Sequence, residues 1–144
     1  MSAQAALREV KPEDIKAMLA LMRQLETRYF EESSFEELFF QLLSDPAMEL
    51  QAAVLNGEIV GFLSLRYHLA LNDGLAAALE EIAVDGRQRE QGVGSALLEW
   101  AVKRAGEKGC RMKEVVCAHR RRRAHEFYRK HGFGDTGRRF QRSL

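Results

Sequence analysis

Residues 79 to 98 read LEEIAVDGRQREQGVGSALL, and this stretch decides the fold. An apolar strand pattern ends at Val84, a polar segment follows, and Gly92 and Gly94 stand one residue apart before an amphipathic run. The pattern predicts a strand, a tight turn and a helix that begins near Gly94, because glycines let the backbone turn sharply. The first amides of such a helix lack partners within it and lie at the positive end of its dipole, so they favour an anion.

The turn is therefore predicted to form a pyrophosphate cradle made of backbone, with Arg87 and Arg89 adding full positive charges. The chain contains no G-x-x-x-x-G-K-[ST] motif of the P-loop type. A dinucleotide-binding fingerprint would need a third glycine or alanine where Leu97 stands, and an acidic ribose partner where Lys113 and Glu114 match poorly. A glycine turn that binds no ligand remains the alternative.

The segments around this turn predict a strand–helix–strand unit. Leu79–Val84 is a strand pattern, residues 94–105 are a helix pattern that ends at Gly106 or Gly109, and Met112–Ala118 is a buried, valine-rich strand pattern. Because a helix connects the two strands, they should run parallel and be joined by a right-handed crossover.

The rest of the chain supplies further strands and helices around this unit. Ser34 with Glu37 predicts a capping box, and Asn56-Gly57 is a strong hairpin signal. In chain order we expect a strand Ala5–Val10, a helix opened by Pro12, a helix from Phe35 to about Leu43, hairpin strands at Met48–Leu55 and 58–65, a turn around Asn72, Asp73 and Gly74, and, after the central unit, a short helix at 124–130 and a strand at 138–144. The predicted fold class is α/β (α+β), with a mixed, mostly antiparallel sheet of six to seven strands and helices on both faces.

Length and composition indicate a single domain over residues 1–144. No apolar stretch approaches the roughly 20 residues of a membrane span and no signal-peptide layout is present, so we expect a cytoplasmic protein without a membrane partner. The net charge is +1 and the basic run Arg120 to Arg123 is local, which favours an anion site over a nucleic-acid partner. Cys110 and Cys117 match no zinc motif, and no metal site is assigned.

Two separated motifs resemble the GCN5-related N-acetyltransferases, the GNAT family. The first is R-x-x-G-x-G at Arg89 to Gly94, after a strand that ends in Ile82-Ala83-Val84-Asp85, and the second is A-x-x-F-Y-x-x-x-G-F from Ala124 to Phe133. Within that family, the chain length and the ending through Arg139-Phe140 look like those of bacterial aminoalkylphosphonate N-acetyltransferases.

The resemblance implies a site for acetyl-CoA. The backbone of Ile82, Ala83 and Val84 would pair with the pantetheine arm like an added strand. The pyrophosphate would be held beside Arg89 by the amides of Gln91, Gly92, Val93, Gly94 and Ser95, and Tyr128 would lie near the coenzyme sulfur. Two positions depart from the family pattern: Arg121 stands where an asparagine near the pantetheine is frequent, and Glu90 where a glycine or a basic residue is usual.

Acetyl transfer to an amine needs a base, because a free alkyl ammonium has a pKa of roughly 10. Glu81 is the candidate base, on the strand beside the coenzyme and at a position where the family places one. Glu80 and Glu81 alternate faces, so only one of them can enter a given cleft. His68 is the alternative base, and Tyr128 is the candidate acid for the leaving thiolate. Direct transfer is expected, since no base adjoins Cys117.

The expected acceptor is a primary amine of a small molecule, and the sequence leaves its class open. Arg66, Arg138, Arg139 and Arg142 suit an anionic acceptor such as a phosphonate, with which a divalent metal could assist, whereas Glu31 and Glu36 suit a cationic one such as a polyamine or an aminoglycoside. A non-catalytic module that binds acetyl-CoA or CoA and regulates a partner is the alternative to an enzyme. Pairing of two copies through the sheet or the last strand is plausible for this family.

Overall fold

The computed structural model describes residues 4–25, 31–115, 122–137 and 140–143. The chain divides into two compact parts, residues 1–114 and 115–144, and each is described by itself. The strands are β1 (Ala6–Glu9), β2 (Met48–Leu55), β3 (Glu58–Ala70), β4 (Gly74–Val84) and β5 (Arg111–Val115). The helices are α1 (Ile15–Leu25), α2 (Glu32–Ser44), α3 (Val93–Glu107) and α4 (Arg122–Lys130), with short 3-10 turns η1 (Pro12–Asp14) and η2 (Gly86–Gln88).

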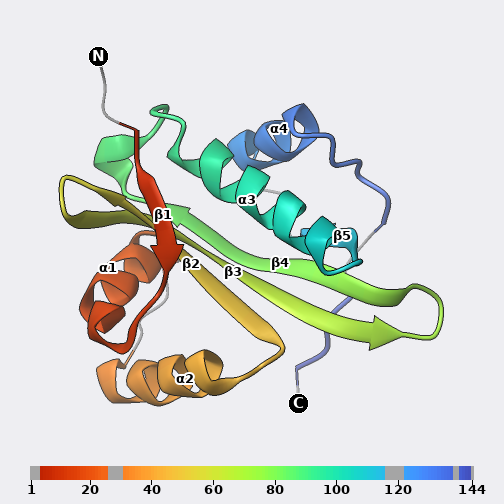
Figure 1. The fold of residues 1–144 in the computed structure, drawn as a ribbon, viewed down its shortest axis with the longest axis horizontal. Coiled ribbons are helices and arrows are strands. Elements are labelled where there is room, and N and C mark those ends of the chain that lie inside the picture. The colour runs from red at the N-terminus through yellow and green to blue at the C-terminus, as the bar shows by residue number, and fades with distance from the viewer. Residues whose placement is uncertain (1–3, 26–30, 116–121, 138–139, 144) are drawn as a thin grey trace. The chain divides into compact units, whose positions relative to one another are not determined.

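The strands follow one another across the sheet in the order β1-β2-β3-β4-β5, and β1 to β4 are antiparallel neighbours (Figure 1). Asn56 and Gly57 both have a positive φ, 52° and 79°, as the predicted Asn-Gly hairpin between β2 and β3 requires. The next hairpin is longer than predicted, because β3 and β4 stay paired as far as Ala70 and Gly74. Pairing with β3 thus keeps β4 extended through a run of alanines, a residue with little strand propensity of its own.

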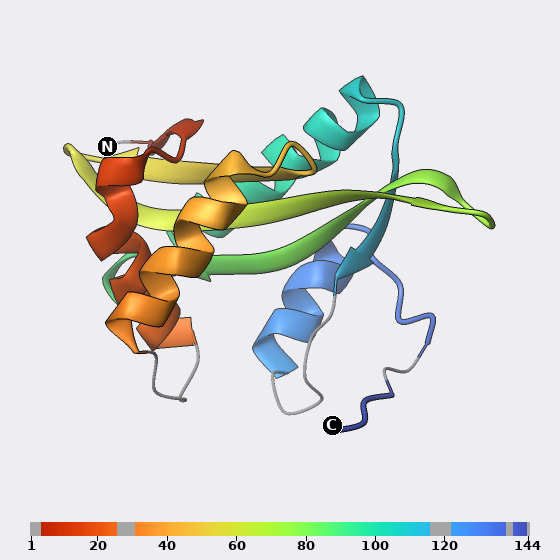
Figure 2. The same cartoon turned by 90° about the horizontal axis from the view of Figure 1, so that it is seen from below.

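Helices cover both faces of this sheet, as predicted. Figure 2 shows α1 and α2 on one face and α3 on the other. On the α3 side, Leu63 and Leu65 of β3 are fully buried, as are Leu97 and Leu98 of the helix. On the α1 side, Met18, Leu21, Phe39, Leu50 and Phe62 belong to one buried cluster. The apolar stripes on the helices therefore each meet one face of the pleated sheet.

A group of ionic contacts holds the C-terminal end of α3 to the sheet. Arg104 donates from Nε to both carboxylate oxygens of Glu49 on β2, at 2.9 and 3.0 Å. Lys108 Nζ lies 3.3 Å from the same carboxylate and Tyr67 donates its hydroxyl to it at 3.0 Å. Burial raises the pKa of Glu49, but the hydrogen bonds from Arg104, Tyr67 and Lys108 together outweigh burial and hold it below its usual value.

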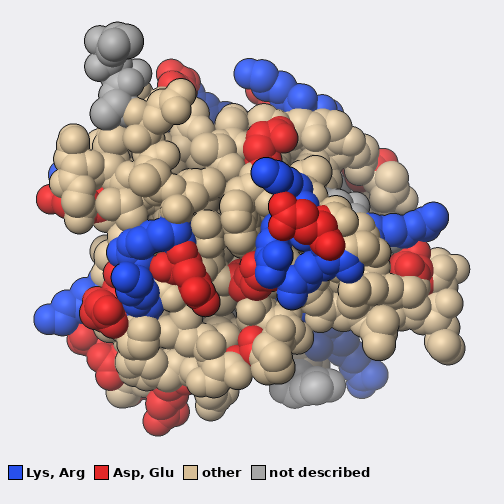
Figure 3. All heavy atoms as spheres, viewed as in Figure 1, with Lys and Arg blue, Asp and Glu red and all other residues tan. Residues whose placement is uncertain are grey.

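On the face drawn in Figure 3, acidic and basic side chains are intermixed.

A second ion pair fixes the entry to α1. Arg8 contacts both carboxylate oxygens of Asp14, at 2.7 and 3.0 Å, and the Lys11 amide donates to Asp14 at 2.7 Å. The hydrogen bond from Arg8 is the main cause that lowers the pKa of Asp14. The helix that Pro12 was predicted to open therefore starts with the 3-10 turn η1 and continues as α1.

Several predicted boundaries need correction. Helix α2 begins at Glu32 with Glu31 as its N-cap, so the predicted capping box of Ser34 and Glu37 is wrong. The Ser33 hydroxyl donates to the Glu31 carboxylate at 2.6 Å, and the Ser34 hydroxyl donates to it at 3.5 Å. These hydroxyls therefore bind the carboxylate before the helix. Gly109, with φ 73°, follows the end of α3, whereas Gly106 lies inside the helix.

The sheet has five strands in the part of the chain that the structure describes, against the six to seven predicted. Residues 140–143 of the predicted last strand are described, and they are not a strand. Sequence alternation alone cannot supply the neighbouring strand with which such a segment must pair. Strand β5 lies next to β4 in the sheet order, as the strand–helix–strand unit requires, while its parallel direction remains a prediction, and residues 116–118 lie outside the described ranges.

The C-terminal part contains α4, which continues to Lys130 and is followed by Gly132 with φ 89°, as predicted. The Tyr128 ring packs edge-on against Phe133, with ring centroids 6.0 Å apart, and is tilted against Phe127, with ring centroids 5.4 Å apart. The Phe133 amide donates to the carbonyl of Tyr128 at 3.0 Å. The second motif of the sequence is therefore a helix with a glycine ending whose aromatic residues contact one another.

Candidate acetyl-CoA and acceptor site

The glycine turn between β4 and α3 has the geometry expected of an anion cradle. Gly92 is the N-cap of α3 with φ 81°, a left-handed backbone that residues other than glycine rarely adopt. The Ala96 amide donates to the Gly92 carbonyl at 3.0 Å, which starts the helical hydrogen bonds. The amides before Ala96 are those that an α-helix leaves without an internal acceptor. Helix α3 therefore presents the positive end of its dipole at this turn.

The polar residues of the turn face solvent. Arg89, Glu90 and Gln91 are exposed, and Glu90 has φ 64°, where a glycine would be unstrained. Arg87 is paired with Asp85, whose carboxylate also accepts from the Arg87 amide at 3.0 Å. Of the two arginines predicted to add positive charge, Arg87 is therefore paired with an acidic neighbour, whereas Arg89 is exposed.

The absence of a side chain at Gly61 brings α3 close to the sheet. A Cβ at Gly61 would lie 3.0 Å from the Ala83 carbonyl oxygen, 3.0 Å from Val93 Cγ1 and 3.4 Å from Leu97 Cδ1. Gly61 is opposite Val84 in the β3–β4 register, and Phe62 is opposite Ala83. The first turn of α3 and the carboxyl end of β4 therefore pack tightly, which brings residues 82–84 and the glycine turn into one region.

A β-bulge aims Glu81 at one face of the sheet. Ser64 is paired with Glu81 and Leu65 with Leu79, so Glu80 is an extra residue in β4. Glu80 points to solvent and forms an ion pair with Arg66 at 2.7 Å. Of the two glutamates only Glu81 lines the cavity described below, and the bulge interrupts the regular alternation from which their separation was predicted.

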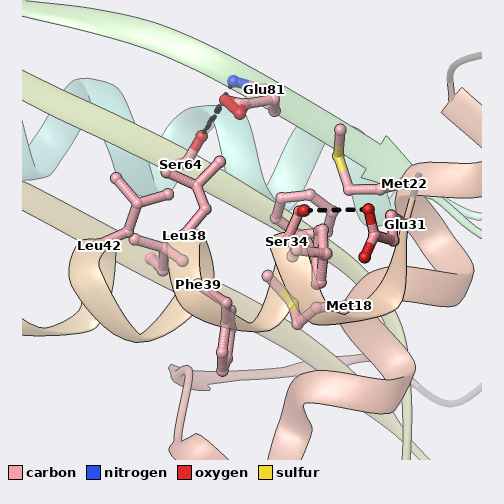
Figure 4. A pocket seen from close by; sticks show the side chains of 12 residues that line it. Met18, Met22, Glu31, Ser34, Leu38, Phe39, Leu42, Ser64 and Glu81 are labelled. Atoms are coloured by element: carbon pink, nitrogen blue, oxygen red, sulfur yellow. Dashed lines mark hydrogen bonds between the residues drawn. The ribbon is translucent and has the colours of Figure 1, made fainter. Parts of the chain in front are cut away.

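The Ser64 hydroxyl binds Glu81 twice. It accepts from the Glu81 amide at 3.0 Å and donates to Glu81 Oε2 at 2.6 Å (Figure 4). Ser64 is only 2% exposed, so water has little access to this contact from its side. The carboxylate of Glu81 is therefore held in a defined orientation by a buried hydroxyl.

Glu81 lines a cavity of about 310 Å³ between the sheet and the two N-terminal helices. Figure 4 shows the side chains of α1 and α2 below β4, with Glu81 and Glu31 at separate places on the wall. The polar lining residues are Glu31, Ser34, Ser64 and Glu81. Most of the remaining wall is apolar and includes Met18, Met22, Phe35, Leu38, Phe39 and Leu42. A molecule in this cavity would meet one carboxylate on the sheet and another at the start of α2.

The structure brings together Glu81, residues 82–84 and the glycine turn in the N-terminal part. Tyr128 belongs to the C-terminal part, so its predicted place beside the coenzyme sulfur stays a prediction, and Arg121 lies outside the described residues. His68 is not among the residues that line the cavity; its Nδ1 is buried without a hydrogen-bond partner among the described residues.

Sequence analysis missed Ser64 and the cavity wall. Met18 and Met22 lie on α1 and form part of the cavity wall. Ser64 lies in an apolar strand pattern, where a single buried serine is the only available signal. The bulge determines which residue of β4 lies opposite Ser64, and no local sequence pattern predicts the bulge.

The fold is that of an acetyltransferase of the GNAT class. The sequence profile of the family described as "Acetyltransferase (GNAT) family" matches residues 15–133, so the chain belongs to this family of acetyl-CoA-dependent N-acetyltransferases. The resemblance in the two sequence motifs is thereby confirmed. Family membership also favours an enzyme over a non-catalytic coenzyme-binding module.

Among individual proteins, the chain is similar to the aminoalkylphosphonate N-acetyltransferase of Salmonella typhimurium. The two are 32% identical over 139 residues, which cover 96% of this chain and 90% of the relative. A solved transcriptional regulator from Bacillus halodurans C-125 is 27% identical, covers 97% of this chain and 99% of its own, and superposes with a TM-score of 0.86.

The fold is also that of the aminoglycoside N-acetyltransferase AAC(6')-Iy in complex with CoA. This structure covers 100% of the present chain and 97% of its own with a TM-score of 0.86, at 18% identity. Over the described residues, no helix is long and apolar enough to cross a membrane. Within the same residues, no cluster of three or more histidine, cysteine or acidic side chains has the arrangement of a metal site.

Proposed function

We propose that this N-acetyltransferase moves the acetyl group of acetyl-CoA directly to a primary amine of a small molecule, with Glu81 as the base. The observation that carries the proposal is the place of Glu81. Its carboxylate lines an acceptor-sized cavity, and the next three residues of the same strand lead to the glycine turn. An amine bound in the cavity would therefore lie beside a coenzyme bound along the end of β4.

The coenzyme would be held mainly by backbone. Amides of Gln91, Gly92, Val93, Gly94 and Ser95 would bind the pyrophosphate at the positive end of the α3 dipole, with Arg89 as the exposed cation beside them. The backbone of Ile82, Ala83 and Val84 would pair with the pantetheine arm, as an extended ligand pairs with a strand. The left-handed Gly92 and the close packing at Gly61 support this assignment.

In the proposed reaction, Glu81 removes a proton from the bound ammonium, directly or through water. The neutral nitrogen then attacks the acetyl carbonyl carbon, a C–N bond forms, the C–S bond breaks, and the nitrogen loses its second proton to solvent as the acceptor leaves as an amide. Tyr128 would give a proton to the departing thiolate and regain one from solvent. Replacement by phenylalanine, Tyr128→Phe, should lower kcat while acetyl-CoA binds as before, and an unchanged kcat would remove Tyr128 from this role.

Coenzyme binding can be tested with a pair of matched glycine variants. Gly92 has φ 81° and Gly57 has φ 79°, and an added Cβ meets no atom within 4 Å at either position. Gly92→Ala and Gly57→Ala should therefore cost about the same backbone strain, roughly 1–2 kcal/mol. Only Gly92→Ala alters the turn, so calorimetry should give an affinity for CoA at least about tenfold weaker than that of Gly57→Ala. Equal affinities would contradict the proposed cradle.

Catalysis is tested by release of CoA thiol from acetyl-CoA in the presence of a panel of amines. The panel contains alkylamines, polyamines, aminoglycosides, amino acids and aminoalkylphosphonates, each with and without a divalent metal. Acetyl-CoA-dependent turnover of at least one amine is expected. Binding of CoA without turnover of any of them would instead favour the non-catalytic module.

A further inference from the structure

We infer that the acceptor is a primary amine on an apolar alkyl or aryl body that carries no anionic group, an inference that rests on the proposed function. This differs from an aminoalkylphosphonate, on which the relative from Salmonella typhimurium acts by its name. The inference comes from the residues that line the cavity. Some of them suit the reacting end of the acceptor, and others suit its body.

The end that reacts must meet Glu81. Because an alkylamine is an ammonium at neutral pH, a carboxylate is a suitable first contact for it. Glu31 adds a second carboxylate to the wall, and the hydroxyls of Ser33 and Ser34 donate to it at 2.6 and 3.5 Å. Both ionisable groups on the described wall are thus acidic, which favours a cation and opposes an anion.

The body of the acceptor must lie along apolar side chains. Phe35 and Phe39 are stacked with ring centroids 6.2 Å apart, and Met18 and Met22 line the wall from α1. A phosphonate buried against these apolar side chains would lose its hydration, whereas burial of methylene groups there is favourable. The flexible methionines suit chains of varied shape.

Of the four arginines that sequence analysis offered to an anionic acceptor, Arg66 is engaged elsewhere, Arg138 and Arg139 lie outside the described residues, and Arg142 belongs to the C-terminal part. Arg66 donates from Nε to Glu80 at 2.7 Å, outside the cavity wall. Among the described residues that line the cavity, there is no lysine or arginine. A phosphonate would therefore meet two carboxylates and no cation among the described lining residues.

The test compares two acceptors of equal spacer length, hexylamine and 6-aminohexylphosphonate. We expect kcat/KM for hexylamine to exceed that for the phosphonate by at least about tenfold, with the same order in calorimetric binding to CoA-saturated protein. Equal values, or a preference for the phosphonate, would overturn the inference. If no amine is turned over, the proposed function is contradicted. Calorimetric binding of the two compounds then still shows whether the cavity prefers hexylamine.

A matched pair of arginine variants tests whether the wall sets this preference. Leu38 lines the cavity and is 54% exposed, while Phe40 on the same helix is 45% exposed and does not line it. Leu38→Arg should reduce the preference for hexylamine over the phosphonate by about tenfold, because it adds a cation to the wall. Phe40→Arg should leave the preference at its wild-type value. The same ratio in both variants would contradict the assignment of this cavity to the acceptor.

Discussion

Glu49 and Glu81 lie on the same sheet in contrasting environments. Arg104, Lys108 and Tyr67 surround the carboxylate of Glu49, whereas Glu81 accepts a hydrogen bond from the buried hydroxyl of Ser64 and lines an apolar cavity. The first carboxylate is bound by groups that stabilise its charge. The second is oriented by a neutral group at a place where a small molecule can reach it.

The comparison indicates that the hydrogen-bond donors around a carboxylate determine whether it serves structure or chemistry. A carboxylate with cationic partners links secondary-structure elements, and here Glu49 links β2 to the C-terminal end of α3. Glu81 is instead held by a buried hydroxyl and lines a cavity, where a base could exchange a proton with its substrate. The bulge in β4 places Glu81 opposite Ser64, while the neighbouring Glu80 forms an ion pair with Arg66.

The largest expected effect is the loss of catalysis in Glu81→Gln. The amide oxygen can still accept from Ser64, so the fold should be retained, but the base is gone and kcat/KM should fall by about 10²- to 10⁴-fold. Glu49→Gln is the matched control and should keep the wild-type rate. Steady-state kinetics with the best acceptor checks both variants, and an undiminished rate in Glu81→Gln would remove the proposed distinction.

The same pair should behave in the opposite way in stability. Glu49→Gln weakens charged hydrogen bonds to α3 and to Tyr67, so its free energy of unfolding should fall by about 1–3 kcal/mol. Glu81→Gln should unfold at nearly the wild-type urea concentration. Equilibrium unfolding in urea measures both, and equal stability of the two variants would show that the contacts of Glu49 are dispensable.

Acid should act on stability mainly through carboxylates with lowered pKa values. The pKa of Glu49 lies below its ordinary value of 4.5 in the folded chain, so the unfolded chain binds more protons as the pH falls. The stabilisation by Glu49 is therefore complete above about pH 5 and is lost as the pH falls through the folded pKa. Urea unfolding from pH 6 to pH 3 should give a shallower decline for Glu49→Gln. An equal decline in the two proteins would refute a role for Glu49 in acid destabilisation. The pKa values of Asp14 and Asp85 are also lowered, so these residues account for the pH dependence that remains in the variant.

The smallest expected effect concerns the hydroxyl that orients Glu81. Ser64→Ala removes one hydrogen bond to the carboxylate, worth about 1 kcal/mol or roughly fivefold in rate. Because that bond favours the ionised carboxylate, the acid limb of the kcat/KM profile should move to higher pH. Ser64→Thr retains the hydroxyl and should keep the limb in place. A lower rate without any shift of the profile would mean that Ser64 supports only the fold.

Much of the fold is predictable from local sequence. Residues 48–55 form the predicted strand, Asn56-Gly57 forms the predicted hairpin, and a helix follows the glycine turn. These features depend on short-range properties, namely alternation of apolar residues, positive φ at glycine and asparagine, and the geometry of a helix start. Where the outcome depended on a distant partner, as for residues 138–144, the prediction failed in its described part.

Two short motifs were enough to indicate the family and the glycine turn, and the resemblance to that family supplied Glu81 as the candidate base. What surrounds that carboxylate could be learned only from the folded chain. Ser64 is 17 residues away along the chain, and the cavity wall comes from two helices that precede it. Their meeting depends on a one-residue bulge and on the packing of helices onto the sheet, and both arise from contacts between strands and helices that are remote in sequence.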